Sequence, residues 1–219
     1  MLKKIAIYGA GGFGREVLMI LQQTNKLRET WDFIGFFDDQ NPESDYFGYP
    51  ILGNYETLNS ISYPLSIVIG IGSPEGKKHV FQKIANPLID FPNIIHPNVQ
   101  ISDFQRVTLG KGNVICGGCV LTTDITIKDF VILNLSCTVG HDAIIESFCS
   151  FMPTVNISGT TVIDEGVYIG TGASIINKVR IHAYTVIGAG SVVTRDIPPR
   201  VLAAGVPAKV KKKLNETLL

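Results

Sequence analysis

The segment Ile157-Ser-Gly-Thr-Thr-Val-Ile163-Asp-Glu-Gly-Val-Tyr-Ile169-Gly-Thr-Gly-Ala-Ser-Ile175 places an isoleucine at every sixth position. An apolar residue recurs at this spacing without a break at Leu109, Ile115, Leu121, Ile127, Leu133, Val139, Ile145, Phe151, Ile157, Ile163, Ile169, Ile175, Ile181, Ile187 and Val193. A helix would repeat near 3.6 residues and a plain strand at two. A period of six, with compact residues two places before each apolar one, indicates a short strand followed by a turn. Hexapeptide repeats of this kind form a parallel β-helix.

The repeat also fixes which residues are neighbours. Three six-residue units make one triangular coil, so a coil takes eighteen residues and the stretch 107–193 holds about five coils. Neighbouring coils pair their strands, which satisfies the backbone hydrogen bonds along the solenoid. Residues eighteen apart are therefore expected to stack directly on one another.

The N-terminal part has a different pattern. A short buried strand, 4–8, is followed at once by Gly9-Ala-Gly-Gly-Phe-Gly14 and by a helical stretch, 15–21. Gly9, Gly11 and Gly14 occupy the three glycine places of the dinucleotide fingerprint, in the strand–turn–helix context that it requires. Glycine lets the backbone approach a phosphate, and the helix N-terminus favours an anion.

A second strand, 33–37, ends in Asp38-Asp39. These carboxylates are placed either to accept hydrogen bonds from a ribose or base, or to lie in a solvated turn. Gly72 follows a later strand and is expected to face the same crevice. The α/β pattern stops near residue 86, so we expect a Rossmann-like domain over 1–90 and a β-helix domain with a closing segment over 91–219. About ninety residues hold only one half of a doubly wound fold, which disfavours an NAD dehydrogenase and favours a mononucleotide-bearing ligand.

Composition narrows the function classes. The formal net charge of zero argues against a nucleic-acid binder, and no apolar run reaches transmembrane length. Few cysteines and no signal peptide favour a cytoplasmic location. Cys116 and Cys119 form a lone CxxC, and Cys119, Cys137 and Cys149 fall on the compact inward register, so they are expected to fill the core instead of binding metal. Lys209, Lys211, Lys212 and Lys213 form either a solvated tail or an anion contact.

The candidate chemistry lies at a turn of the repeat, where His141 is followed by Asp142. An imidazole supported by a carboxylate is suited to general-base work, although the two residues also fit a plain surface pair. Gly159 lies eighteen residues on and should stack beneath His141, where its N–H would face a developing oxyanion. Asn134 is expected near the same edge, either in the site or as a turn residue that bonds the backbone.

Taken together, these motifs resemble the NeuD/PglD-like sugar acetyltransferases. The resemblance covers both domains through the glycine turn, Phe37-Asp-Asp39, Ile69-Gly-Ile-Gly72, Asn134 with Gly140-His-Asp142, and Gly205-Val-Pro-Ala-Lys209. It implies a left-handed β-helix, a homotrimer with CoA between neighbouring solenoids, and acetyl transfer from acetyl-CoA to a nucleotide-linked sugar of the 4-amino-4,6-dideoxyhexose type for bacterial surface glycans.

The resemblance also implies roles for single residues. His141 matches the family's base and Asp142 its acidic neighbour, with Asn134 beside them. The nucleotide-sugar contacts match Gly11, Gly12, Phe13, Asp38, Asp39 and Gly72. The acetyl-CoA contacts match Ser150, Gly159, Thr171 and Ala189. Some family members have histidine where Phe13 or Ser150 stands, so these two positions depart from the pattern. No metal is implied.

Three other functions fit parts of the pattern. A sugar O-acetyltransferase of the sialic-acid type would share every motif. A zinc enzyme of the γ-carbonic anhydrase type needs three converging histidines, and the regular coils hold only His141 and His182, without the required spacing. A non-catalytic nucleotide-binding scaffold would lack acetyl transfer.

Overall fold

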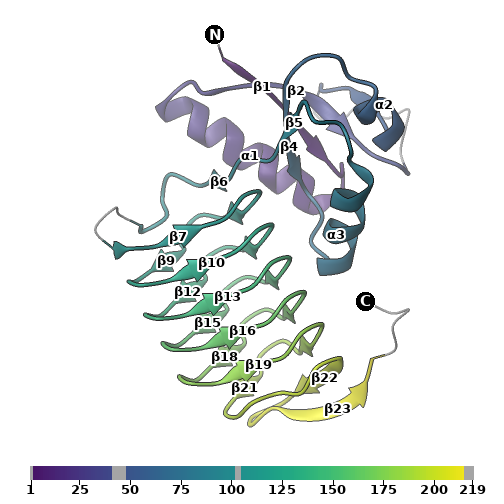
Figure 1. Ribbon diagram of the computed structural model, residues 1–219. Coiled ribbons are helices and arrows are strands. Elements are labelled where there is room, and N and C mark those ends of the chain that lie inside the picture. The colour runs from purple at the N-terminus through teal and green to yellow at the C-terminus, as the bar shows by residue number, and fades with distance from the viewer. Residues whose placement is uncertain (1, 41–47, 102–104, 215–219) are drawn as a thin grey trace.

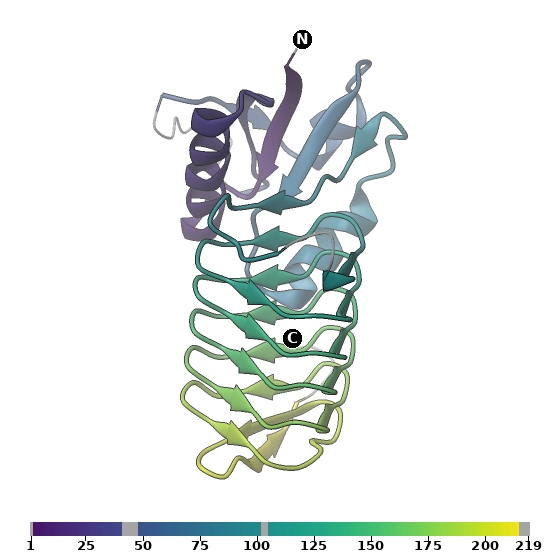
Figure 2. The same ribbon diagram turned by 90° about the vertical axis from the view of Figure 1, so that its left-hand side faces the viewer.

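The computed structural model describes residues 2–40, 48–101 and 105–214. An α/β domain lies on one end of a long solenoid, whose coils stack away from it (Figure 1). The turned view shows the three-sided coils below that domain (Figure 2). Among the described residues, no helix is long and apolar enough to cross a membrane.

The N-terminal domain is built on a parallel sheet in the order β3-β2-β1-β4-β5. Its elements are β1 (Lys3–Tyr8), α1 (Gly12–Leu27), β2 (Trp31–Phe37), β3 (Ile51–Gly53), α2 (Tyr55–Asn59), β4 (Leu65–Ile69), α3 (Pro74–Lys83) and β5 (Ile89–Asp90). The strand order reverses between β1 and β4, which is where open α/β sheets bind their ligands. β4 and β5 extend the sheet on the far side of β1, so the domain holds more strands than the single half of a doubly wound fold that its length predicts. The sequence patterns do not predict β5 or α2.

The turn between β1 and α1 requires glycine for steric reasons, as the fingerprint implies. Gly9 has a φ of +103°, in the left-handed region. A β-carbon on Gly14 would lie 1.9 Å from the carbonyl oxygen of Gly9, so only glycine lets α1 begin this close to β1. The helix begins at Gly12, three residues before the predicted start.

The solenoid consists of three sheets, and in its regular coils the strands are parallel with paired residues eighteen apart, as predicted. The third sheet departs from this at its ends, where Ile94 pairs with Val114, Val186 pairs with Leu202, and the last two strands are antiparallel. One sheet runs β7 (Thr108–Leu109), β10 (Thr126–Ile127), β13 (Ile144–Ile145), β16 (Val162–Ile163) and β19 (Arg180–Ile181). The next runs β9 (Val120–Leu121), β12 (Thr138–Val139), β15 (Asn156–Ile157), β18 (Ser174–Ile175) and β21 (Val192–Val193). The third runs β6 (Ile94–Ile95), β8 (Val114–Ile115), β11 (Ile132–Leu133), β14 (Ser150–Phe151), β17 (Tyr168–Ile169), β20 (Val186–Ile187), β22 (Val201–Ala204) and β23 (Lys209–Lys213). The first two sheets have five strands each, which confirms the five coils.

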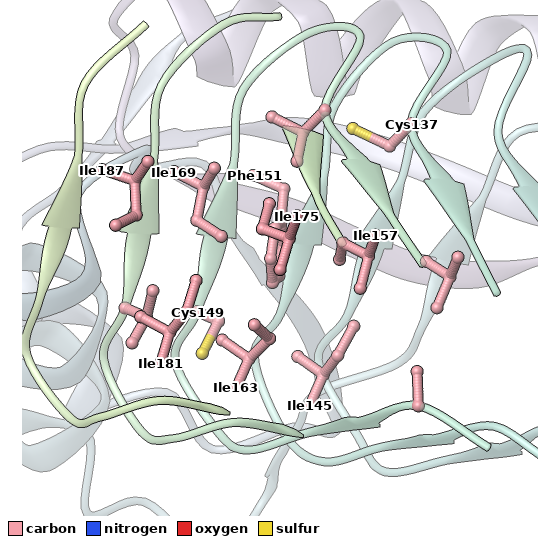
Figure 3. Close-up of a cluster of buried hydrophobic side chains, with 14 of the residues drawn as sticks. Cys137, Ile145, Cys149, Phe151, Ile157, Ile163, Ile169, Ile175, Ile181 and Ile187 are labelled. Carbon is pink, nitrogen blue, oxygen red and sulfur yellow. The ribbon is translucent and has the colours of Figure 1, made fainter. Parts of the chain in front are cut away.

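The predicted apolar register fills the axis of the solenoid. Figure 3 shows Ile157, Ile163, Ile169 and Ile175 pointing inward from successive strands, with Cys137 and Cys149 among them. Cys119, Cys137 and Cys149 are all 0% exposed, so the cysteines of this register are core residues as expected. Cys116 differs, because it packs outside the solenoid in the cluster that contains α1.

Each corner of the solenoid uses one left-handed residue. All fifteen positions at six-residue spacing from Arg106 to Gly190 have a positive φ, and the non-glycine members include Phe130, Asp142 and Phe148. The N–H of such a residue donates to the coil before it, as Asp142 does to the Thr123 oxygen at 3.2 Å. These hydrogen bonds offset a backbone cost of about 1–2 kcal/mol per non-glycine residue.

The two domains pack through one sheet and one corner. α1 covers the outward face of β6, β8 and β11 in a shared apolar cluster. α3 lies on the corner formed by Phe130 and Phe148, whose rings stack at 5.3 Å with an interplanar angle of 4°. Further along this corner, Lys78 of α3 donates to Tyr184 at 2.6 Å. The α/β domain thus covers the first coils of the solenoid and is also fixed along one of its corners.

Candidate active site

A cleft of about 460 Å³ opens where the strand order of the N-terminal sheet reverses. The glycine turn before α1 forms one wall, the turn and first residues of α3 form the other, and the end of β2 closes it. All six residues predicted to contact the nucleotide sugar line this cleft: Gly11, Gly12, Phe13, Asp38, Asp39 and Gly72. The tertiary structure therefore brings together three segments that are far apart in sequence.

The two aspartates of this cleft are both held by hydrogen bonds. Asp38 accepts from the Ala10 N–H at 2.9 Å and from the Gln40 N–H at 2.8 Å, which joins the end of β2 to the glycine turn. Asp39 accepts from the Tyr8 hydroxyl at 2.5 Å. Burial, and then the bond to Asp39, raise the pKa of Tyr8, so the phenol stays neutral and donates. These hydrogen bonds fix both carboxylates in place at the cleft.

The second candidate centre is the solenoid corner after β12. Nδ1 of His141 lies 2.7 Å from Oδ2 of Asp142, and both side chains are more than half exposed. Adjacent side chains on a flat strand point apart, but Asp142 has a φ of +58° and turns its carboxylate back toward the imidazole. With Nδ1 held by the carboxylate, Nε2 is the ring nitrogen that has no partner among the described residues.

Gly159 lies against the imidazole, as the eighteen-residue spacing predicts. A β-carbon at Gly159 would lie 2.6 Å from Nε2 of His141, so the glycine leaves the space that the ring occupies. Among the described residues, the Gly159 N–H has no acceptor. The corner therefore combines a carboxylate-supported imidazole with an adjacent unpaired backbone donor.

Asn134 does not share this edge, contrary to expectation. It follows β11, at the corner before β12, whereas His141 follows β12. Its side chain is 6% exposed, and its Oδ1 accepts from the Leu135 N–H at 2.7 Å. Asn134 therefore acts as a turn residue that bonds the backbone, and β12 separates it from His141 within the protomer.

The residues assigned to acetyl-CoA fall on different parts of the solenoid. Thr171 and Ala189 are exposed and stack at the corner that also holds Asn134. Gly159 lies at the His141 corner. Ser150 is 0% exposed on the outward face of β14, and its hydroxyl has no hydrogen-bond partner. The Ser150 hydroxyl is thus closed off from solvent within this chain, and its contact with CoA stays a prediction.

Two residues of the cleft were missed by the sequence reasoning. Tyr8 is the last residue of β1 and so reaches the same sheet edge as Asp38. Its position at the end of a predicted strand is the signal that identifies it. His79 has an exposed side chain that also lines the cleft. It lies three residues after Gly76, another lining residue, which places both on one face of α3.

No group of three or more metal-ligating side chains that could hold an ion occurs in the described part of the chain. His182, the other histidine of the regular coils, has its Nδ1 3.1 Å from Oδ2 of Asp164. The Asp164 carboxylate also pairs with Arg180. The contact between His182 and Asp164 therefore belongs to a surface ion network.

Comparison with known proteins gives two family matches. Residues 4–84 match the PglD N-terminal domain, and residues 160–195 match the bacterial transferase hexapeptide family of six repeats. The GDP-perosamine N-acetyltransferase of Escherichia coli O157:H7 is 29% identical over 214 residues, which cover 94% of this chain and 96% of that protein.

Solved structures agree with both domains. The acetyltransferase domain of PglB from Neisseria gonorrhoeae, in complex with acetyl coenzyme A, is 30% identical, with a TM-score of 0.86 over 96% of this chain and 100% of that one. A histidine-to-asparagine mutant of perosamine N-acetyltransferase from Caulobacter crescentus, in complex with CoA and GDP-perosamine, is 29% identical, with a TM-score of 0.87 over 97% of this chain and 99% of that one.

Proposed function

This chain belongs to the PglD-like sugar acetyltransferases with hexapeptide repeats, and we propose that it acetylates the amino group of a nucleotide-linked 4-amino-4,6-dideoxyhexose. As a member of the family it is an acetyltransferase that uses acetyl-CoA. Acceptors of this class serve bacterial surface glycan synthesis. Acetyl-CoA and nucleotide sugars are made in the cytoplasm, so we propose that the reaction takes place there.

The pairing of His141 with Asp142 above Gly159 is the observation that carries this proposal. The acceptor amine attacks the thioester carbonyl carbon, and Nε2 of His141 takes the proton that the nitrogen loses. Asp142 holds Nδ1 and stabilises the imidazolium, while the Gly159 N–H donates to the oxyanion. Collapse of the tetrahedral intermediate expels the CoA thiolate, which receives the proton from His141. No covalent enzyme intermediate is needed.

The placement of the two centres favours a homotrimer with active sites between subunits. The nucleotide cleft lies in the domain that covers the β6–β8–β11 face and the Phe130 corner, whereas His141 lies at the corner that joins the other two sheets. A sugar bound in one protomer's cleft is thus turned away from its own His141. We propose that it reaches the His141 of a neighbouring protomer.

The CoA residues support the same arrangement. Gly159 lies at the His141 corner, whereas Thr171 and Ala189 lie at the corner on the other side of β12 and β15. We propose that one CoA lies between two solenoids, where it contacts the His141 corner of one protomer and the Thr171 corner of the next.

The test is a thiol-release assay with acetyl-CoA across a panel of nucleotide-linked 4-amino sugars, with the matching 4-hydroxy sugars alongside. We expect release with the amino sugars. Release with the hydroxy sugars alone would identify an O-acetyltransferase, and no release with any acceptor would contradict acetyl transfer.

Replacing His141 by alanine tests the role of the base. We expect His141→Ala to lower kcat by about 10²–10⁴-fold, the usual worth of a general base, with the KM for acetyl-CoA nearly unchanged. His182→Ala is the matched control, because it removes the other histidine–aspartate pair of the coils and should leave kcat unaltered. Normal turnover by His141→Ala would remove His141 from the mechanism.

A further inference from the structure

His79 is a hydrogen-bonding side chain of the nucleotide cleft that neither the family motifs nor the comparisons assign. Two of the residues that line the cleft, Asp38 and Asp39, carry negative charge. Among the lining residues, only His79 has a side chain that can carry a positive charge. Lys83 of α3, whose Nζ lies 3.9 Å from Oδ2 of Asp39, offsets part of the negative charge of the aspartates although it does not line the cleft. A nucleoside diphosphate that enters the cleft brings further negative charge, which favours a hydrogen-bond donor on the cleft wall.

The other ionisable side chains of the cleft wall, those of Tyr8, Asp38 and Asp39, are already engaged. The Tyr8 hydroxyl donates to Asp39, and Asp38 accepts from two backbone N–H groups. His79 differs, because neither of its ring nitrogens has a hydrogen-bond or ion-pair partner among the described residues. An imidazole that lines a cleft with its donors unused is available to a ligand.

The position of His79 on α3 also separates it from the aspartates. Asp38 and Asp39 follow β2, whereas His79, Gly76 and Gly72 line the wall formed by the β4–α3 turn and by α3 itself. The wall opposite α3 is formed by the glycine turn, where Phe13 has no hydrogen-bond donor on its side chain. The cleft is therefore acidic at the end of β2 and open to an anion between the glycine turn and α3.

We propose that His79 is a substrate-positioning residue, which donates a hydrogen bond to the diphosphate of the nucleotide sugar while the aspartates accept from its hydroxyl groups. This role rests on the proposed function. A charge-assisted hydrogen bond from an imidazolium to a phosphate oxygen is stronger than a neutral one. The contact acts on binding and leaves unaltered the acetyl-transfer step, which is assigned to His141, Asp142 and Gly159.

Calorimetric titration of the full chain with UDP, GDP and the corresponding nucleosides tests this role without requiring turnover. We expect His79→Ala to weaken diphosphate binding by about tenfold and nucleoside binding by less than about twofold. His79→Lys, which restores a positive charge, should recover most of the affinity. His182→Ala is the control for loss of a histidine from the surface.

Kinetics with the nucleotide sugar provide the second readout. The KM for the sugar should rise by the same factor in His79→Ala, with kcat and the KM for acetyl-CoA unchanged. If the wild-type chain binds neither diphosphate, the nucleotide-sugar assignment fails and the role of His79 fails with it. If the wild type binds them and His79→Ala binds equally well, or loses nucleoside affinity to the same extent, only the role of His79 is overturned.

Discussion

At the scale of single residues, the proposed catalytic corner at His141 depends on two backbone positions. Asp142 has a φ of +58°, which directs its carboxylate to Nδ1 of His141. Gly159 has no positive φ, but its missing side chain leaves the space for the imidazole. Asp142 is required for its backbone conformation, whereas Gly159 is required because the imidazole lies against it. Substitutions at the two positions should therefore lower activity for different reasons.

Gly159→Ala should therefore inactivate the enzyme while leaving it folded. The new methyl group would lie 2.6 Å from Nε2, so the flexible imidazole must move away from its position beside the Gly159 N–H. We expect kcat to fall by about 10²-fold or more, since misplacement of a catalytic group by 1 Å costs that much. Steady-state kinetics and a thermal melt measured together check this, and a variant with normal kcat would contradict the stacking.

At the scale of elements, the corners show how the repeat tolerates strained residues. Gly190 has a φ of +65° and no atom within 4 Å of where a β-carbon would lie, so it isolates the backbone cost from any steric clash. We expect Gly190→Ala to lower the free energy of unfolding by about 1 kcal/mol, because alanine resists the left-handed region. Gly190→Asn is the matched control, and asparagine should cost less. Urea denaturation measures both, and equal stabilities for the two variants would contradict this explanation.

Helix α3 is tied to the solenoid by a buried lysine. Lys77 is 1% exposed, and its Nζ donates to the carbonyl oxygens of Phe130 and Cys149, both at 2.9 Å. A neutral amine has two N–H groups, which match these two acceptors. Burial lowers the pKa of Lys77 to about 7, in agreement with a neutral amine above that pH.

This lowered pKa gives a pH dependence of defined sign. The unfolded chain keeps the Lys77 proton up to the ordinary pKa of 10.5, whereas the folded chain loses it near 7, so the unfolded state binds more protons between these values. Stability should therefore rise with pH across this window, by at most about 1.4 kcal/mol per pH unit. Urea denaturation of the wild type and of Lys77→Met at several pH values isolates the contribution of Lys77 to the free energy of unfolding, because methionine does not titrate. Parallel pH profiles would show that the buried amine stays charged.

At the scale of the whole molecule, the proposed active site is divided between protomers. If His141 from one protomer meets the Thr171 corner of the next, two inactive variants should complement each other. His141→Ala lacks the proposed base, and Thr171→Trp fills the space at the Thr171 corner where CoA is proposed to bind.

Mixed trimers of these two variants test the division. In a random equal mixture, about a quarter of the sites combine an intact His141 with an intact Thr171 corner, so about a quarter of wild-type activity should return. Coexpression followed by the thiol-release assay measures this. Sites built within one protomer would always carry one of the lesions, and the mixture would then stay at background.

The sequence alone determined the solenoid, its eighteen-residue coil and the contact between His141 and Gly159. It also located the glycine turn and the aspartates after β2 that line one cleft. These features follow from local periodicity, because a repeat that returns to the same face every six residues fixes its neighbours without reference to the rest of the chain.

Only the tertiary structure decided which outward-facing residues stay open to a ligand. Ser150 and Thr171 both lie outside the core register, yet the first is fully buried and the second is exposed. His79 has the pattern of a surface residue and became part of the cleft when α3 docked beside the glycine turn. The physical reason is that a repeat specifies which side chains point inward, whereas the fate of those that point outward depends on the other domain that covers them.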